Sequence, residues 1–183
     1  ISRRYGRGAG FKYPRPEGAH YVVAVDLGTR QCGVALGVVS GRSSSELLAC
    51  ATVHQRDGDT AGMAGQVLGW AIDTIESCIH SPFMPIILVC EWPVKYDWDP
   101  DKHEDIESLQ AVGRLIPWHE KYEPSEWKAQ VKKAPHRLRI KGLLRAAELE
   151  LMPPTTHHDA WDAAGIFLFA AGRCRAGGVK PCA

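Results

Sequence analysis

The sequence predicts an α/β fold with about five strands and with helices on both faces of the sheet. Three β-rich runs follow one another closely between residues 21 and 53, and helical and strand-like runs then alternate toward the end of the chain. The chain has 183 residues, of which 45% are apolar, enough for one well-filled core and too little for two full domains. We therefore expect one domain at residues 21–176, with a basic arm at residues 1–20 and a tail at residues 177–183.

The first three runs predict an antiparallel meander. Residues 21–27 (YVVAVDL) and 32–39 (CGVALGVV) are rich in β-branched and apolar residues, and only the short turn GTRQ separates them. Residues 47–53 form a third run of the same kind. Connections this short join antiparallel neighbours, so the three strands are expected side by side in chain order.

A helix and a buried strand are expected next. Apolar positions recur at helical spacing between residues 59 and 80, and Pro82 follows as a stop. Residues 85–90 (PIILVC) are apolar at nearly every position, as in a strand covered on both faces, and they lead directly into Glu91. A loop rich in aromatic and acidic residues follows at residues 92–103.

The second half of the chain predicts two helices around a strand. A short helix ends before Pro117, and its apolar stripe consists of Ile106, Leu109, Val112, Leu115 and Ile116. A strand is expected near residues 118–123. The last helix opens with Thr155 or Thr156 as its cap and is nearly free of charge after Asp162, as a core helix would be.

Residues 128–145 contain seven Lys or Arg residues and no acid, the strongest charge asymmetry in the chain. The pattern predicts a helix with an apolar face made of Ile140, Leu143, Leu144, Ala147 and Leu151. Its basic face carries Arg137, Lys141 and Arg145. Such a face is either a solvated surface or a set of phosphate contacts, for which Lys132, Lys133 and Arg137 are the candidates.

Overall composition excludes several classes of protein. Lys and Arg number 22 against 21 Asp and Glu, so net charge indicates neither a nucleic-acid nor a membrane partner. No apolar stretch is long enough for a membrane helix, and residues 1–20 lack the apolar centre of a secretory signal. We expect a cytoplasmic protein, in a host cytoplasm if phage-encoded or in an organelle after processing. Six scattered cysteines without CxxC spacing indicate buried thiols rather than disulfides or zinc ligands.

Four acids stand inside or beside apolar runs, where an ionised carboxylate costs several kcal/mol unless a cation or donors compensate it. Asp26 lies near the end of the first strand, Glu91 ends the buried strand, and Asp159 and Asp162 share one face of the last helix. Each alone has an ordinary alternative: a turn cap, the first exposed residue after a strand, or an acid at a helix start. Together they predict a site with oxygen ligands, which favours Mg²⁺ or Mn²⁺ over zinc. His158 is a candidate auxiliary group.

These segments resemble the ribonuclease-H-like nucleases, and more narrowly the RuvC-type Holliday junction resolvases, including phage forms. The resemblance rests on VVAVDLGTRQCGVAL, IILVCE, EPSEWKAQV and HHDAWDAAGIFLF, in that order, and covers about residues 21–175. It implies a ribonuclease-H-like fold with a five-stranded mixed sheet. It also implies that Asp26, Glu91, Asp159 and Asp162 bind two Mg²⁺ or Mn²⁺ ions, as catalytic carboxylates.

The resemblance also implies roles for basic and aromatic residues. Lys128 matches a functional lysine that follows the family's proline, and Arg139 stands where the family has a second lysine. KKAP replaces the glycine-rich turn expected between the two. The family's aromatic wedge after the strand-ending acid has no match at Val94, so Trp92, Tyr96 or Trp98 would have to substitute, with Tyr96 preferred.

Three functions fit these observations. The first is a metal-dependent endonuclease acting on branched DNA, such as four-way junctions or flaps, as a homodimer whose contact includes the helix carrying Leu109. The second is a related enzyme such as a YqgF-like nuclease. DLGTRQCGVAL also resembles the phosphate-binding opening of actin-like ATPases, but those need a second lobe that this length does not supply. The third is a non-catalytic nucleic-acid or ribonucleoprotein component that kept the fold.

Overall fold

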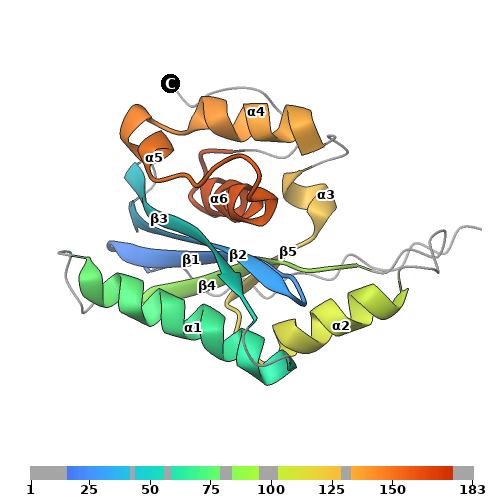
Figure 1. Ribbon diagram of the computed structural model, residues 1–183. Helices are drawn as coiled ribbons and strands as arrows, with labels where there is room; N and C mark the ends of the chain where they lie inside the picture. Colours follow the sequence, from blue (N-terminus) through green and yellow to red (C-terminus); the bar gives the residue numbers. More distant parts are fainter. Residues whose placement is uncertain are drawn as a thin grey trace, which may run out of the picture.

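The computed structural model describes residues 16–41, 44–55, 59–78, 84–94, 103–128 and 133–174. Its centre is a five-stranded sheet in the order β3-β2-β1-β4-β5, with helices on both faces (Figure 1). The strands are β1 (His20–Asp26), β2 (Gln31–Ser40), β3 (Ser44–His54), β4 (Ile86–Glu91) and β5 (Glu120–Tyr122). The helices are α1 (Thr60–Ser77), α2 (His103–Arg114), α3 (Pro124–Trp127), α4 (Lys133–Leu143), α5 (Ala146–Glu150) and α6 (His158–Ala170). The predicted α/β fold is confirmed.

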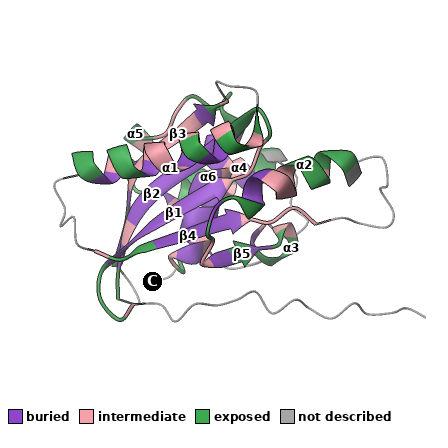
Figure 2. Cartoon of the chain, turned by 90° about the horizontal axis from the view of Figure 1, so that it is seen from below, coloured by how far each residue is buried: buried purple, intermediate pink, exposed green. Residues whose placement is uncertain are grey.

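Strand pairing places the ends of β1 and β4 at the same edge. The antiparallel meander β1-β2-β3 is present as predicted, and β1 pairs with β4 in parallel, as β4 does with β5. Parallel neighbours end at the same edge of a sheet, so Asp26 and Glu91 emerge together. β1 and β4, in the middle of the sheet, are largely buried (Figure 2).

Helices α1 and α2 cover one face of the sheet, below it in Figure 1. Asp59 caps α1 by accepting a hydrogen bond from the backbone N–H of Gly62, which satisfies one of the helix's unpaired donors. Met63 and Val67 of α1 pack with Val23 and Val25 of β1 in one apolar cluster. Each of these four side chains is at most 1% exposed, so this layer is well packed.

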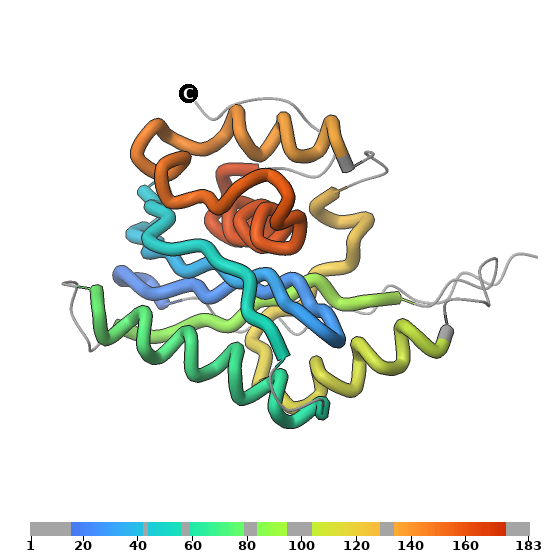
Figure 3. Tube along the Cα trace, in the orientation of Figure 1, coloured from blue at the N-terminus to red at the C-terminus, as the bar shows by residue number. Residues whose placement is uncertain are grey.

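Helix α6 occupies the other face, between the sheet and α4 (Figure 3). It can approach closely because β2 carries glycines beneath it. A Cβ atom at Gly37 would lie 2.3 Å from ring carbons of Phe167, and one at Gly33 would lie 1.8 Å from the carbonyl oxygen of Asp159. The second contact involves main chain on both sides, so the start of α6 rests directly on β2.

Two local predictions were wrong. The helix expected through Leu151 breaks after Leu143, and α5 turns its Glu148 inward, where it bonds Arg173, so Ala147 and Leu151 are exposed. Burial of the Glu148–Arg173 ion pair thus determines the orientation of α5, rather than burial of the apolar residues Ala147 and Leu151. Thr155 and Thr156 do not cap α6, because its N-cap is His157. The short helix α3 was not predicted at all.

Two expectations from composition can be compared with the described residues. None of their helices is long and apolar enough to cross a membrane. The five cysteines within them are free, and Cys32, Cys90 and Cys174 are buried as predicted, whereas Cys50 and Cys78 are only partly buried. Of the expected arm, residues 1–15 lie outside the described part of the chain, as does the tail.

Candidate functional site

The predicted acids converge at the end of the sheet where β1 and β4 terminate. Asp26 is the last residue of β1 and Glu91 the last of β4, while Asp159 and Asp162 belong to the first two turns of α6 above them. Asp26 pairs with Gly33 in the sheet, and Gly33 contacts the backbone of Asp159. Strand and helix carboxylates are therefore brought together by main-chain packing.

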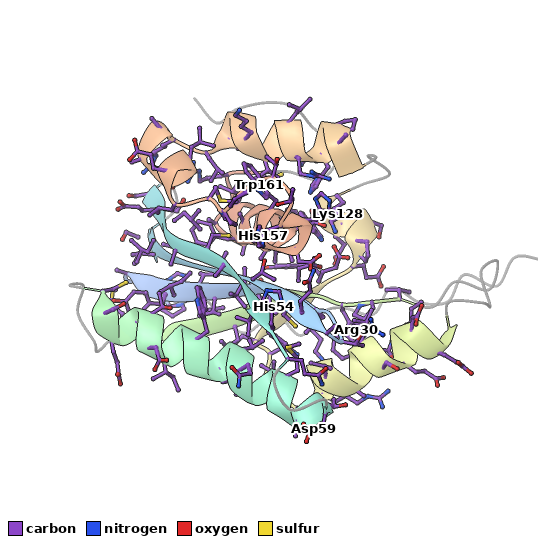
Figure 4. All side chains as sticks on the ribbon, in the orientation of Figure 1. Arg30, His54, Asp59, Lys128, His157 and Trp161 are labelled. Carbon is purple, nitrogen blue, oxygen red and sulfur yellow. The ribbon has the colours of Figure 1, made fainter. Side chains whose placement is uncertain are left out.

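The ammonium group of Lys128 lies between two of these carboxylates. Its Nζ is 2.9 Å from Oε2 of Glu91 and 3.0 Å from Oδ2 of Asp162. Lys128 caps the C-terminal end of α3 and points toward α6, near the right-hand end of the sheet in Figure 4. Burial alone would lower the pKa of Lys128, but Asp26, Glu91 and Asp162 outweigh burial and raise it, so the group stays charged.

Asp26 is the least compensated of the four acids. Burial raises the pKa of Asp26 well above its usual range, and the neighbouring carboxylates of Glu91, Asp162 and Asp159 raise it further, while Lys128 acts in the opposite direction. No hydrogen-bond donor to the Asp26 carboxylate is found in the described part of the chain. An additional cation at this point would therefore be strongly stabilised.

Two side chains that the sequence did not single out orient the acids. The indole N–H of Trp127, which is fully buried, donates to Oε2 of Glu91 at 2.8 Å. The amide of Gln31 donates to Oδ2 of Asp159 at 2.6 Å. Both residues lie within segments that the sequence analysis quoted. Trp127, in EPSEWKAQV, is 36 residues from Glu91, and Gln31, in the GTRQ turn, is 128 residues from Asp159. No local signal could have paired them.

A third side chain, His136, was also missed. It is buried at 2% exposure against Trp127, with ring centroids 4.9 Å apart, and its Nε2 lies 4.0 Å from Oδ1 of Asp162. Neither ring nitrogen has a hydrogen-bond partner in the described part of the structure. Burial lowers the pKa of His136 to about 4, with the charges of Lys128 and Arg139 acting in the same direction and Asp162 against them. At neutral pH the ring is therefore uncharged.

The other predicted residues lie elsewhere. His158 is exposed, and no contact of its side chain with the carboxylates is found among the described residues. Arg139 donates to Sγ of Cys174, and Arg137 donates to the backbone oxygen of Thr155 at 3.1 Å, so both also tie α4 to segments flanking α6. Tyr96 and Lys132 lie outside the described residues, as does the side chain of Lys133.

The aromatic residue next to Glu91 is already packed. The Trp92 ring carries the ammonium of Lys121 3.7 Å from its centroid. On α2, a Cβ atom at Gly113 would lie 2.7 Å from a ring carbon of Trp92. Trp92 is thus part of the β4-β5-α2 packing, which leaves it poorly placed to act as a wedge.

The donor set suits a hard divalent cation, and a cation already lies within it. All four candidate ligands are carboxylates, which Mg²⁺ and Mn²⁺ prefer. Among the described residues no three potential ligands are in a ready-made metal-binding arrangement. Glu91 and Asp162 instead face the Lys128 ammonium, which stands in for the positive charge that the acids need.

Comparison with known proteins shows the fold. No family model and no curated protein matches the sequence. The structure resembles that of Thermus thermophilus RuvC in complex with a Holliday junction substrate, with 17% identity and a TM-score of 0.53 over 85% of this chain and 98% of that one. A second Thermus thermophilus RuvC structure has 17% identity and a TM-score of 0.50 over 88% and 99%. The chain thus has the ribonuclease-H-like fold that its sequence predicted.

Proposed function

We propose that the protein is a metal-dependent endonuclease that cleaves phosphodiester bonds in branched DNA. The observation that carries the proposal is the convergence of Asp26, Glu91, Asp159 and Asp162 from two adjacent strand ends and one helix, with Lys128 among them. A purely structural role would not require four acids so close together, since their mutual repulsion destabilises the fold. The likeness to RuvC supports the choice of substrate.

The four carboxylates would hold Mg²⁺ or Mn²⁺, two ions per site by the resemblance. Such ions supply activation of water and stabilisation of the charge that develops on the leaving oxygen. Trp127 and Gln31 hold the carboxylates of Glu91 and Asp159 in fixed orientations through their hydrogen bonds. Lys128 would leave the carboxylates of Glu91 and Asp162 to contact a phosphate oxygen of the substrate.

Substrate binding would draw on the basic segment before and along α4. Phosphate contacts from Lys and Arg position a strand without reading its sequence. Lys132, Lys133 and Arg137 remain the candidates for this role, and Arg139 would have to leave Cys174 to contact phosphate.

A homodimer would present two such sites to two strands of a junction. The apolar stripe expected to form its contact is partly used within the subunit: Val112 and Ile116 are 2% and 4% exposed and belong to the core. Ile106 and Leu109 are only half-buried and Leu115 is exposed, so these three are what the stripe could still offer a second copy. Sedimentation of the protein with and without a four-way junction measures the state directly, and a monomer in both would exclude paired cleavage.

The experiment that tests the function compares three labelled substrates: a four-way junction, a flap and a linear duplex, each with Mg²⁺ or with EDTA. We expect cleavage of the branched substrates with Mg²⁺ only. Binding without cleavage under every metal condition would instead support a non-catalytic nucleic-acid component. Equal cleavage of all three substrates would remove the preference for branched DNA.

A further inference from the structure

A pocket of about 400 Å³ adjoins the carboxylates on the side of the β1-β2 turn. It is bounded by that turn, by α2 and by the start of α6. Leu27 and Leu109 supply apolar surface, and Arg30, Gln31 and Asp159 supply polar groups. The turn is tight here, since a Cβ atom at Gly28 would lie 1.7 Å from the backbone oxygen of Gln31.

The pocket and the acid site share a wall. Asp159 lines the pocket and also belongs to the carboxylate cluster, and the hydrogen bond from Gln31 fixes its side chain between the two. Whatever occupies the pocket therefore lies next to the reacting phosphate of the proposed function. Leu109, which the sequence placed in the expected subunit contact, also lines this pocket.

The size and charge of the pocket select its occupant. A space of about 400 Å³ accommodates one nucleoside but no duplex. Two carboxylates, Asp105 and Asp159, line it against the single cation Arg30, so a phosphate would be repelled from its interior. A neutral base and sugar would not be repelled. Asp105 can also accept hydrogen bonds from an exocyclic amine of the base.

Arg30 is placed to hold the phosphate at the rim. It is exposed at the tip of the turn, and no partner for its guanidinium is found among the described residues. In Figure 4 Arg30 and Lys128 lie toward the same end of the sheet, on opposite sides of it. A strand could thus contact both cations as it crosses the acid site.

We propose that this pocket receives one unpaired nucleoside adjoining the cut phosphate, with its base and sugar against Leu27 and Leu109 and its phosphate on Arg30. The inference rests on the proposed nuclease function. It explains a preference for branched DNA, because the nucleotides at a branch point are already partly unstacked and cost less to extrude than those within a duplex.

The test uses a four-way junction carrying 2-aminopurine at the branch point, because this base fluoresces more strongly when it leaves the stack. Fluorescence is measured with the full chain in Ca²⁺, and cleavage is measured separately in Mg²⁺. We expect the wild-type protein to raise the fluorescence severalfold. Leu109→Trp, which fills the pocket, should abolish that rise and slow cleavage at least about tenfold, while junction affinity changes less than about threefold.

Two controls separate the pocket from general effects. Ile72→Trp adds the same bulk to an exposed position of α1 and should behave as wild type. Arg30→Gln, at an exposed position that should not disturb folding, is expected to slow cleavage about tenfold, with partial recovery in Arg30→Lys. Arg114→Gln removes one charge at the far end of α2 and should leave the rate within about twofold.

Wild-type fluorescence and cleavage rate in both Leu109→Trp and Arg30→Gln would overturn the pocket proposal while leaving the nuclease intact. A fluorescence rise that Leu109→Trp abolishes, in a protein that cleaves nothing, would support the pocket and overturn the nuclease proposal. An equal loss of rate in Arg30→Gln and Arg114→Gln would show that only net charge matters, and would also overturn the role of Arg30.

Discussion

Glu148 and Asp26 are both carboxylates surrounded by protein, yet their environments are opposite. Burial would raise the pKa of Glu148, but the guanidinium of Arg173 and the backbone N–H groups of Arg145 and Leu47 bond both its oxygens and lower it instead. Burial raises the pKa of Asp26, and three further carboxylates add to the effect. The surroundings of Glu148 compensate its negative charge, and those of Asp26 do not.

The contrast separates an acid whose charge the chain compensates from acids whose charge it compensates only in part. Glu148 joins α5 to β3 and to the segment after α6, so its partners are all supplied by the chain. The acid site receives one ammonium, from Lys128, for four carboxylates. A half-buried cluster of acids with too few positive charges around it is typical of a functional site.

Asp26→Asn should have the largest effect. We expect junction cleavage in Mg²⁺ to fall at least about a thousandfold, because a ligand of the proposed metal site is lost, while junction affinity changes less than about threefold. Single-turnover rates and a binding titration in Ca²⁺ measure the two quantities. Near-normal cleavage at saturating Mg²⁺ would remove Asp26 from the site.

The same substitution should stabilise the metal-free protein. The raised pKa of Asp26 means that its charged form opposes folding, increasingly as the pH rises through that pKa, and asparagine removes the charge. A gain of about 1 kcal/mol corresponds to roughly 2–4 °C in Tm for a chain of this size. Thermal unfolding in EDTA at pH 8 should show the gain, and it should shrink at low pH, where Asp26 is protonated. A lower Tm at pH 8 would contradict the comparison with Glu148.

Glu148→Gln should have the reverse profile, with activity retained per folded molecule and stability reduced. The substitution leaves Arg173 without its charged partner, and breaking a buried pair costs about 3–5 kcal/mol, reduced to roughly 2–4 here because Arg173 is partly exposed. Urea unfolding at pH 7 measures the loss. Glu150→Gln, at an exposed position of the same short helix, serves as the control and should change stability by less than about 0.5 kcal/mol.

His136 extends the comparison to a buried base. Its folded pKa of about 4 lies below the value of about 6.5 in the unfolded chain, so the unfolded state takes up the proton first as the pH falls. Stability should therefore decline from pH 6.5 toward pH 4, by at most about 3 kcal/mol. His136→Leu should remove this part of the pH dependence, whereas His54→Leu, at an exposed position, should not. Parallel pH profiles for the wild type and His136→Leu would refute the assignment.

Lys128→Met should have the smallest and most specific effect. Without the ammonium, Glu91 and Asp162 are available to a divalent cation, so Mn²⁺ should bind about 3–10-fold more tightly in calorimetry even though cleavage slows. Lys141→Met, at an exposed position of α4, should leave the Mn²⁺ affinity unchanged. Weaker Mn²⁺ binding in Lys128→Met would show that the lysine assists metal binding rather than competing with it.

The contrast between Asp26 and Glu148 also shows which acids can be recognised as important from the sequence alone. Asp26 and Glu91 were found because each ends an apolar run, and Asp159 and Asp162 because three-residue spacing shares a helix face. Glu148 drew no attention, since AAELELM reads as an ordinary helix and Arg173 is 25 residues away. The same ion pair, invisible in the sequence, explains why the predicted long helix breaks before α5.

The orienting residues escaped prediction for a related reason. Gln31 and Trp127 act through single hydrogen bonds across the fold, and His136 through burial, and none of these leaves a periodic pattern. The pocket beside Leu109 escaped prediction as well, because an apolar stripe on a helix does not show which other elements it faces. Its place beside Asp159 depends on how α2 and α6 meet the β1-β2 turn.

The backbone contact at Gly33 determines how the site responds to change elsewhere. Asp26 pairs with Gly33 in the sheet and Gly33 touches the carbonyl oxygen of Asp159, so a main-chain contact links the first strand acid to the helix acids. The distance between these acids therefore depends on the sheet. We expect that repacking of distant core residues would move β2 and the start of α6 together. A single added methyl group at position 33 would instead act as a wedge between them. Position 33 therefore tolerates no side chain larger than that of glycine without a shift of the main chain at Asp159.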